Sequence, residues 1–104
     1  MPAIDPARAR AMSSRARMTV EFFYEPLRLK QGGTRPFRFF SRVIEEQHER
    51  EFVLQRNGEW KPTDLLELAR FGHNDVITVE VSADQARGLI EQYWGAEAAD
   101  KALS

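Results

Sequence analysis

Few side chains in this sequence have the chemistry of a catalyst, and its two histidines, His48 and His73, come first. An imidazole nitrogen with a pKa near neutrality can act as a nucleophile, a base or a metal ligand. The sequence has no cysteine, however, and it has no metal-ligand cluster, no nucleophile paired with a base and no Walker-type phosphate loop. We therefore expect a protein that is not an enzyme and that carries no metal or cofactor.

A segment that could bind an anion is Gly32-Gly33-Thr34-Arg35. If a helix begins here, Gly33, Thr34 and Arg35 offer backbone N–H groups, a hydroxyl and a guanidinium beside the positive end of that helix. Arg35 would then be a bidentate donor to a phosphate or a carboxylate. The simpler interpretation, which we favour, is a glycine turn, a threonine N-cap and an exposed arginine.

The elements that would hold this segment follow from the spacing of apolar residues. Alternation over 18–24 predicts a strand, which Glu25-Pro26 would end because proline has no backbone donor. Thr34 is a suitable N-cap for the next element, and Pro36 fits a first helical turn. The expected helix has an apolar face formed by Phe37, Phe40 and Ile44, with Val43 beside them.

The second half of the chain contains stronger local signals. A predicted strand over 52–56 is followed by Asn57-Gly58, the typical turn of a β-hairpin. A short helix is expected over 64–70, with Gly72 in the position of a left-handed terminator. Another strand is expected over 75–81, because its apolar residues alternate with polar ones.

The last predicted helix begins at a capping box, in which Ser82 caps the backbone and Gln85 reaches back to it. Gly95 would end this helix. Its apolar face is formed by Ala86, Leu89, Ile90 and Tyr93. The order of elements is therefore strand, helix, strand, strand, short helix, strand and helix, which predicts an α+β fold with helices packed on one side of a sheet.

The length of the chain predicts one small domain, and its apolar runs are too short to cross a membrane. We place this domain at 18–95. A flexible extension rich in arginine and alanine would precede it over 1–17, and a flexible tail would follow over 96–104.

The element order and several short motifs resemble those of HPr, the histidine-containing phosphocarrier of the bacterial sugar phosphotransferase system. HPr typically reads Asn-Pro-Leu-Gly-Leu-His-Thr/Ala-Arg-Pro at its first helix, and here Pro26-Leu27 and Thr34-Arg35-Pro36 occupy the two ends of that motif. Further matches follow in order at Phe40, Gly58, Thr63-Asp64-Leu65 and Gly72. The resemblance covers about Met18 to Trp94. It implies an open-faced sandwich, in which helices cover one side of a four-stranded antiparallel sheet.

The phosphate-accepting histidine of HPr is missing. Its place is taken by Gly33 when the motif is aligned from the proline side, and by Lys30 when it is aligned from Pro26-Leu27. Neither residue can replace a nucleophilic imidazole. The resemblance thus implies a cytoplasmic, regulatory protein-binding domain without phosphocarrier activity. Its partner would be enzyme I or another regulator of sugar transport or carbon metabolism.

The same resemblance assigns two further features. Asp64 stands where many HPr proteins have a regulatory serine, so its fixed charge could mimic the phosphorylated state, although a helix N-cap explains it more simply. HPr partners dock on the exposed faces of the first two helices. The corresponding residues here are Arg38, Leu65 and Leu66, with Phe39 as a further candidate.

An alternative function is a small binding module unrelated to HPr. Its contact with nucleic acid would use the basic arm formed by Arg8, Arg10, Arg15 and Arg17. The acidic balance of the rest of the chain argues against this function, and a solvated extension is the simpler interpretation of the arm, which we favour. The sequence indicates no membrane partner and assigns no oligomeric state.

Overall fold

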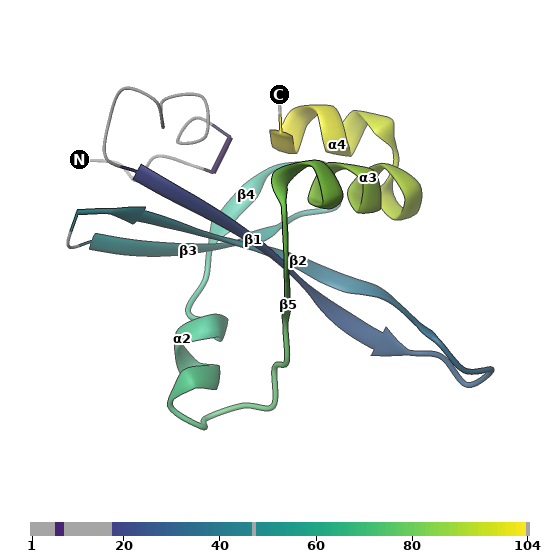
Figure 1. Ribbon diagram of the computed structural model, residues 1–104, viewed down its shortest axis with the longest axis horizontal. Coiled ribbons are helices and arrows are strands. Elements are labelled where there is room, and N and C mark those ends of the chain that lie inside the picture. The colour runs from purple at the N-terminus through teal and green to yellow at the C-terminus, as the bar shows by residue number, and fades with distance from the viewer. Residues whose placement is uncertain (1–5, 8–17, 47, 104) are drawn as a thin grey trace.

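A five-stranded antiparallel sheet forms the centre of the protein (Figure 1). The computed structural model describes residues 6–7, 18–46 and 48–103. The strands are β1 (Met18–Arg28), β2 (Thr34–Glu45), β3 (His48–Leu54), β4 (Trp60–Pro62) and β5 (Val79–Val81), and the helices α2 (Leu65–Arg70), α3 (Ala83–Trp94) and α4 (Ala96–Leu103). The strand order in the sheet is β4-β3-β2-β1-β5, so the last strand returns to pair with the first.

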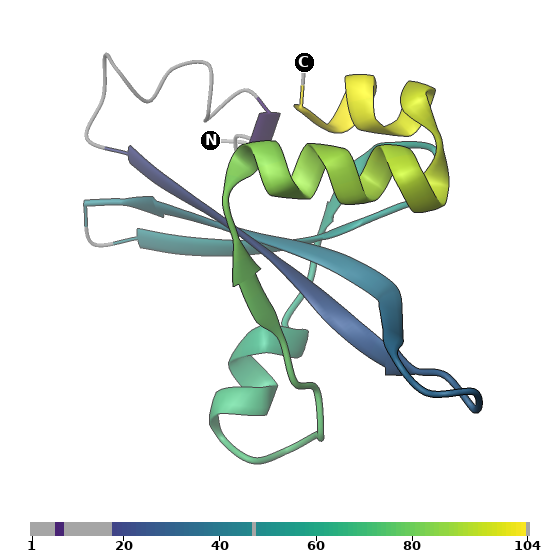
Figure 2. The same ribbon diagram turned by 45° about the vertical axis from the view of Figure 1, so that its right-hand side comes forward.

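Two layers of helix lie on opposite sides of this sheet. Helices α3 and α4 cover one face, whereas the short α2 lies on the other side (Figures 1 and 2). The α+β class and the open antiparallel sheet are thus confirmed. The sheet has five strands where four were expected, and the helices do not all share one side.

The largest difference from the sequence prediction is β2, because Thr34–Glu45 is a strand and not a helix. It pairs with β1 along its whole length, from Met18 opposite Glu45 to Arg28 opposite Thr34. Strand β1 also continues past the proline at which we expected it to end, and an irregularity between Glu25 and Pro26 accommodates this. The element order therefore departs from that of HPr at this point.

The physical reason is that both faces of β2 are covered. Phe39 packs against residues of α3 and α4, and Val43 lies on the same face in a second cluster with Phe52, while Phe40 points to the opposite face and is also fully buried. A strand buried on both faces loses the alternation of apolar and polar residues. The apolar stripe Phe37, Phe40, Ile44 and Val43 therefore fitted helical spacing by coincidence.

The elements with strong local signals are confirmed. Gln55 and Glu59 close the hairpin around Asn57-Gly58 with a hydrogen bond of 2.7 Å, from the backbone N of Gln55 to the carbonyl of Glu59. Helix α3 has the predicted capping box between Ser82 and Gln85. Gly72 and Gly95 have positive φ at the ends of their helices.

Two predictions about the second half are wrong in detail. Asp64 occupies the N-cap position of α2 but makes no side-chain capping hydrogen bond; instead the Thr63 hydroxyl accepts one from the backbone N of Leu65, at 3.2 Å. The strand expected over 75–81 is regular only over Val79–Val81, because its pairing with β1 is limited to those residues.

Helix α4 occupies most of the segment expected to be a flexible tail. Its buried residues are Ala98, Ala99, Ala102 and Leu103. Alanine gives a weak apolar signal in a sequence, but its small side chain lets the helix approach the β3–β4 turn closely. The expected extension over 1–17 lies outside the described residues, except for residues 6 and 7.

The helix α4 is fastened to the β3–β4 turn by three contacts. The Trp60 indole donates a 3.0 Å hydrogen bond to the carbonyl of Ala102, and Gly58 lies directly under the α4 backbone. Lys101 donates a 3.0 Å hydrogen bond to the Glu59 carboxylate. This hydrogen bond and the charge of Lys101 lower the pKa of Glu59 below its ordinary value.

Candidate binding edge of the sheet

Strand β5 is an edge strand with one free side. It pairs with β1 through Val81 opposite Phe22, Glu80 opposite Phe23 and Val79 opposite Tyr24. Among the residues that the structure describes, no strand pairs with its other side. The backbone N–H and C=O groups of that side are available to a further strand, as they are at any uncovered sheet edge.

A groove of about 570 Å³ runs between β5 and α3, beside this free edge. Its lining residues are Tyr24, Val79, Glu80, Val81, Gln85, Gly88, Leu89 and Gln92. The wall from β5 is mostly apolar, whereas α3 contributes amide side chains and a glycine. Glu80 is the one charged residue of the lining, and because side chains alternate along a strand, its carboxylate lies on the sheet face opposite Val79 and Val81.

Gly88 has no side chain, so α3 does not project into the groove at this position. A Cβ atom at this position would meet no atom within 4 Å, so packing within the described chain does not require a glycine. Glycine inside a helix costs about 1 kcal/mol relative to alanine. The missing side chain leaves room for an extended backbone to lie close to α3.

Apolar side chains continue along the exposed edge. Val79 is 41% exposed, and Ile77, just before the strand, is 72% exposed. Natural proteins usually protect such an edge with lysine, proline or a covering loop. The segment 75–82 contains neither lysine nor proline. The edge therefore has the features of a strand-binding surface.

The predicted anion site has a different setting from the expected one. Gly33 lies in the turn between β1 and β2, and Thr34 and Arg35 begin β2 as exposed residues. Since no helix begins here, the positive helix end on which that site depended is absent from this part of the described chain.

Two of the four predicted partner-binding residues, Leu66 and Phe39, are buried and so are not available to a partner. Arg38 lies on the sheet face opposite α3, where its Nε donates a 2.5 Å hydrogen bond to Glu25. Leu66 is buried at 5% exposure and Leu65 is half-buried, whereas Phe39 lies in the core at 1% exposure. Asp64 is exposed, as a charged residue at that position can be.

Ionic contacts on that outer face join β1, β2 and β3. Arg42 bonds to Glu21 at 3.2 Å and to Glu51 at 3.1 Å, and its guanidinium stacks over the Phe23 ring. Arg70 of α2 also approaches Glu51, at 3.8 Å. Each of these charges has a partner, so the cluster holds the strands together. The described residues contain no group of His, Cys, Asp and Glu suited to a metal ion.

Comparison with known proteins adds no relative: the chain matches no family model, and no curated protein or solved structure shows significant similarity to it. Within the described ranges, no helix is long and apolar enough to span a membrane.

The groove was not among the predicted sites, although the sequence contains two signals for it. One is a strand-forming segment without lysine or proline, and the other is Gly88 in the middle of an amphipathic helix. Neither signal shows that the two meet, because their proximity depends on the return of β5 to β1.

Proposed function

We propose that this chain is a protein-binding domain that accepts an extended segment of a partner protein as a sixth strand beside β5. The observation that carries the proposal is the open edge of β5 next to the groove against α3. Strand addition to a sheet edge takes its affinity from main-chain hydrogen bonds and its specificity from alternate side chains.

The chemistry of the groove defines the segment that fits. Side chains on the helix side of the added strand would contact Val79, Val81 and Leu89, so they should be apolar. Side chains on the other side would face Glu80, for which a lysine or arginine is the complementary partner. An extended segment that alternates apolar and basic residues meets both requirements.

The protein-binding role expected from the HPr resemblance is kept here in its general form only. Binding to enzyme I, regulation of sugar transport and a cytoplasmic location rested on that resemblance, and β2 stands where its first helix should be. These finer expectations are not needed for strand addition at β5.

A direct test uses ¹⁵N-labelled protein and a short synthetic peptide of alternating lysine and valine. We expect saturable shifts in the amide resonances of Val79, Glu80, Val81 and Gly88. A second peptide with glutamate in place of lysine should bind more weakly, since its charges would face Glu80. Shifts confined to another surface, or equal binding of both peptides, would contradict the proposal.

Two tryptophan variants separate the groove from general effects on α3. Gly88→Trp should fill the groove and abolish peptide binding, because Gly88 is exposed and a Cβ atom added there would meet no atom within 4 Å. Glu91→Trp is the matched control, since Glu91 is exposed on α3 but does not line the groove. It should leave peptide binding unchanged. Sedimentation of the unmodified protein and of Gly88→Trp then shows whether the chain forms a dimer and whether that dimer is lost when the groove is filled.

A further inference from the structure

The ends of β1 and β2 form a two-stranded ribbon that projects beyond the rest of the sheet (Figures 1 and 2). Strand β3 pairs with β2 only from Phe40 onward, and β5 pairs with β1 only through Tyr24. Beyond these points the ribbon continues from Pro26 opposite Pro36 to Arg28 opposite Thr34, followed by the turn. Its paired part is about 10 Å long at about 3.3 Å per residue.

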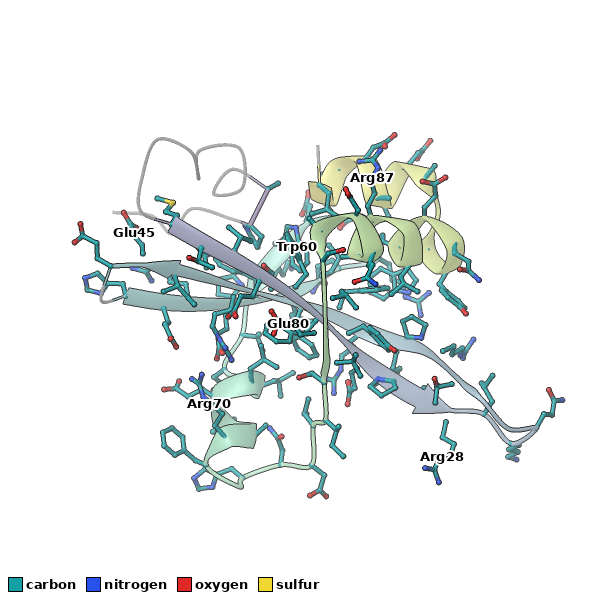
Figure 3. All side chains as sticks on the ribbon, in the orientation of Figure 1. Arg28, Glu45, Trp60, Arg70, Glu80 and Arg87 are labelled. Atoms are coloured by element: carbon teal, nitrogen blue, oxygen red, sulfur yellow. The ribbon has the colours of Figure 1, made fainter. Side chains whose placement is uncertain are left out.

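The charge of the ribbon is one-sided. Residues 26–37 include Arg28, Lys30 and Arg35 and no aspartate or glutamate, so the ribbon carries +3 while the chain as a whole carries −1. All three side chains are exposed, and none forms an ion pair with another described residue. Figure 3 shows Arg28 directed away from α3 and α4.

The base of the ribbon has a more mixed environment. A groove of about 340 Å³ separates it from the segment before β5, and the lining includes Arg28, Glu25 and Asp75. Glu25 is already bonded to Arg38. The positive charge that has no ion-pair partner among the described residues is therefore distributed along the ribbon, with Arg28 and Arg35 on its strands and Lys30 in the turn.

Prolines at the base of the ribbon and glycines in its turn keep it two-stranded and narrow. Pro26 and Pro36 lie opposite each other at its base, and proline cannot donate to a neighbouring strand. Gly32 and Gly33 form the turn with φ of 91° and 80°, and no atom lies within 4 Å of the positions of their missing Cβ atoms. The tip thus presents backbone with little bulk between cationic side chains.

The narrow shape and positive charge of the ribbon match the grooves of a nucleic-acid duplex. A two-stranded β-ribbon fits the major groove of B-form DNA, which is about 12 Å wide. Arginine and lysine at its tip can contact the phosphates on both sides of that groove. The major groove of A-form RNA is too narrow and deep for such an element. The half-exposed Leu27, Leu29 and Phe37 add apolar contacts to the charged ones.

We infer that the β1–β2 ribbon is a binding site for duplex DNA, with Arg28, Lys30 and Arg35 contacting the phosphate backbone. This surface is separate from the β5 groove and does not depend on the function proposed above. It also differs from the basic arm formed by Arg8, Arg10, Arg15 and Arg17, because all three cations lie on the hairpin. Within 18–104 the residues outside the ribbon are acidic on balance, which favours contact at the ribbon over the rest of this part of the chain.

The test measures binding of the full chain to a fluorescein-labelled DNA duplex by fluorescence anisotropy over a series of salt concentrations. Each phosphate contact contributes about −0.9 to the slope of log K against log salt, so three contacts give about −2.7. The double variant Arg28→Ala with Arg35→Ala should reduce the slope to about −0.9.

A charge-matched control removes two exposed cations elsewhere. Arg50→Ala with Lys61→Ala changes the net charge equally but leaves the ribbon intact, and it should keep the slope and affinity of the unmodified protein. Equal losses in both double variants would overturn the inference, as would the absence of binding at low salt. Tighter binding to duplex RNA or to phosphatidylserine vesicles than to DNA would overturn it too. Retained binding of the lysine–valine peptide by the ribbon variant would show that the two surfaces are independent.

Discussion

The two edge strands of the sheet, β4 and β5, differ in how well they are protected against pairing with a further strand, although both are three residues long. The β4 edge contains Lys61 and Pro62, which discourage further pairing. Its turn lies against α4, and Figure 3 shows Trp60 beneath the helices that it contacts. Strand β5 has neither protection, and a groove lies beside it.

The difference shows that a short edge strand can be closed or open according to what packs next to it. At the β4 edge, Gly58 is needed because α4 approaches closely. At the β5 edge, Gly88 is not needed for packing among the described residues. Gly58 thus allows a contact with α4 inside the chain, whereas Gly88 leaves space in which a partner could contact α3.

The largest loss of stability is expected from adding a side chain at Gly58, where α4 packs against the β3–β4 turn. A Cβ atom there would lie 2.8 Å from the Ala98 carbonyl oxygen, and the residue has φ of +91°. Gly58→Ala should lower the free energy of unfolding by about 2–4 kcal/mol through strain and overpacking. Urea denaturation measures this value. Gly33→Ala is the control, because Gly33 also has positive φ but no nearby atom; an equal loss there would show that the α4 contact is unimportant.

A smaller loss is expected when the β4 edge keeps its shape but loses a hydrogen bond. Trp60→Phe leaves the Ala102 carbonyl without its indole donor, which should cost about 1–3 kcal/mol. Trp94→Phe is a comparison without that hydrogen bond, although its indole packs edge-on against Phe39 and lies under the Arg56 guanidinium. Thermal unfolding measures both variants, and no loss for Trp60→Phe relative to the unmodified protein would remove the hydrogen bond as a stabilising contact.

At the open edge, a substitution should increase stability. Gly88→Ala is expected to raise the free energy of unfolding by about 0.5–1 kcal/mol, because alanine favours the helix and the Cβ atom meets nothing. Chemical denaturation provides the measurement. A loss of stability would mean that the wall of the groove is already packed, and the contrast between the edges would fail.

The smallest expected effect is the pH dependence of folding stability that arises from Glu59. The pKa of Glu59 is lowered by the hydrogen bond from Lys101, so the ionised carboxylate favours the folded state. Its contribution is present above the pKa of the unfolded chain and is lost as pH falls through the lower pKa of the folded state. Lys101→Ala should return the Glu59 pKa to its ordinary value in an NMR titration. An unchanged pKa would show that Lys101 does not hold the carboxylate; high salt should weaken the effect in the unmodified protein.

Sequence patterns predicted the elements whose signals lie within a few residues. The Asn57-Gly58 hairpin, the Ser82–Gln85 capping box and the terminating Gly72 all belong to this class. Their geometry is set by backbone preferences and by neighbouring side chains, which a single sequence contains.

The elements that the sequence did not predict depend on distant contacts. Thr34–Glu45 becomes a strand because β1 and β3 pair with its two sides. Helix α4 depends on alanines that fit under a distant turn. The site predictions at Gly33–Arg35 and Arg38 depended on a helix in this region, so they changed with it, and both the groove and the projecting ribbon became visible only in three dimensions.

The return of β5 to the first strand has a consequence for the order of folding. Strands β1 to β4 are joined by hairpins, whereas Tyr24 and Val79 are roughly 55 residues apart in the chain, and closing such a loop costs more entropy. We therefore expect the meander to form first and β5 to join last, and β5 amides to exchange with solvent sooner than those of β2. A sixth strand would then slow the opening of β5, which is the least protected strand of the sheet. Partner binding should therefore reduce the hydrogen-exchange rates of the β5 amides even if the fold itself does not change.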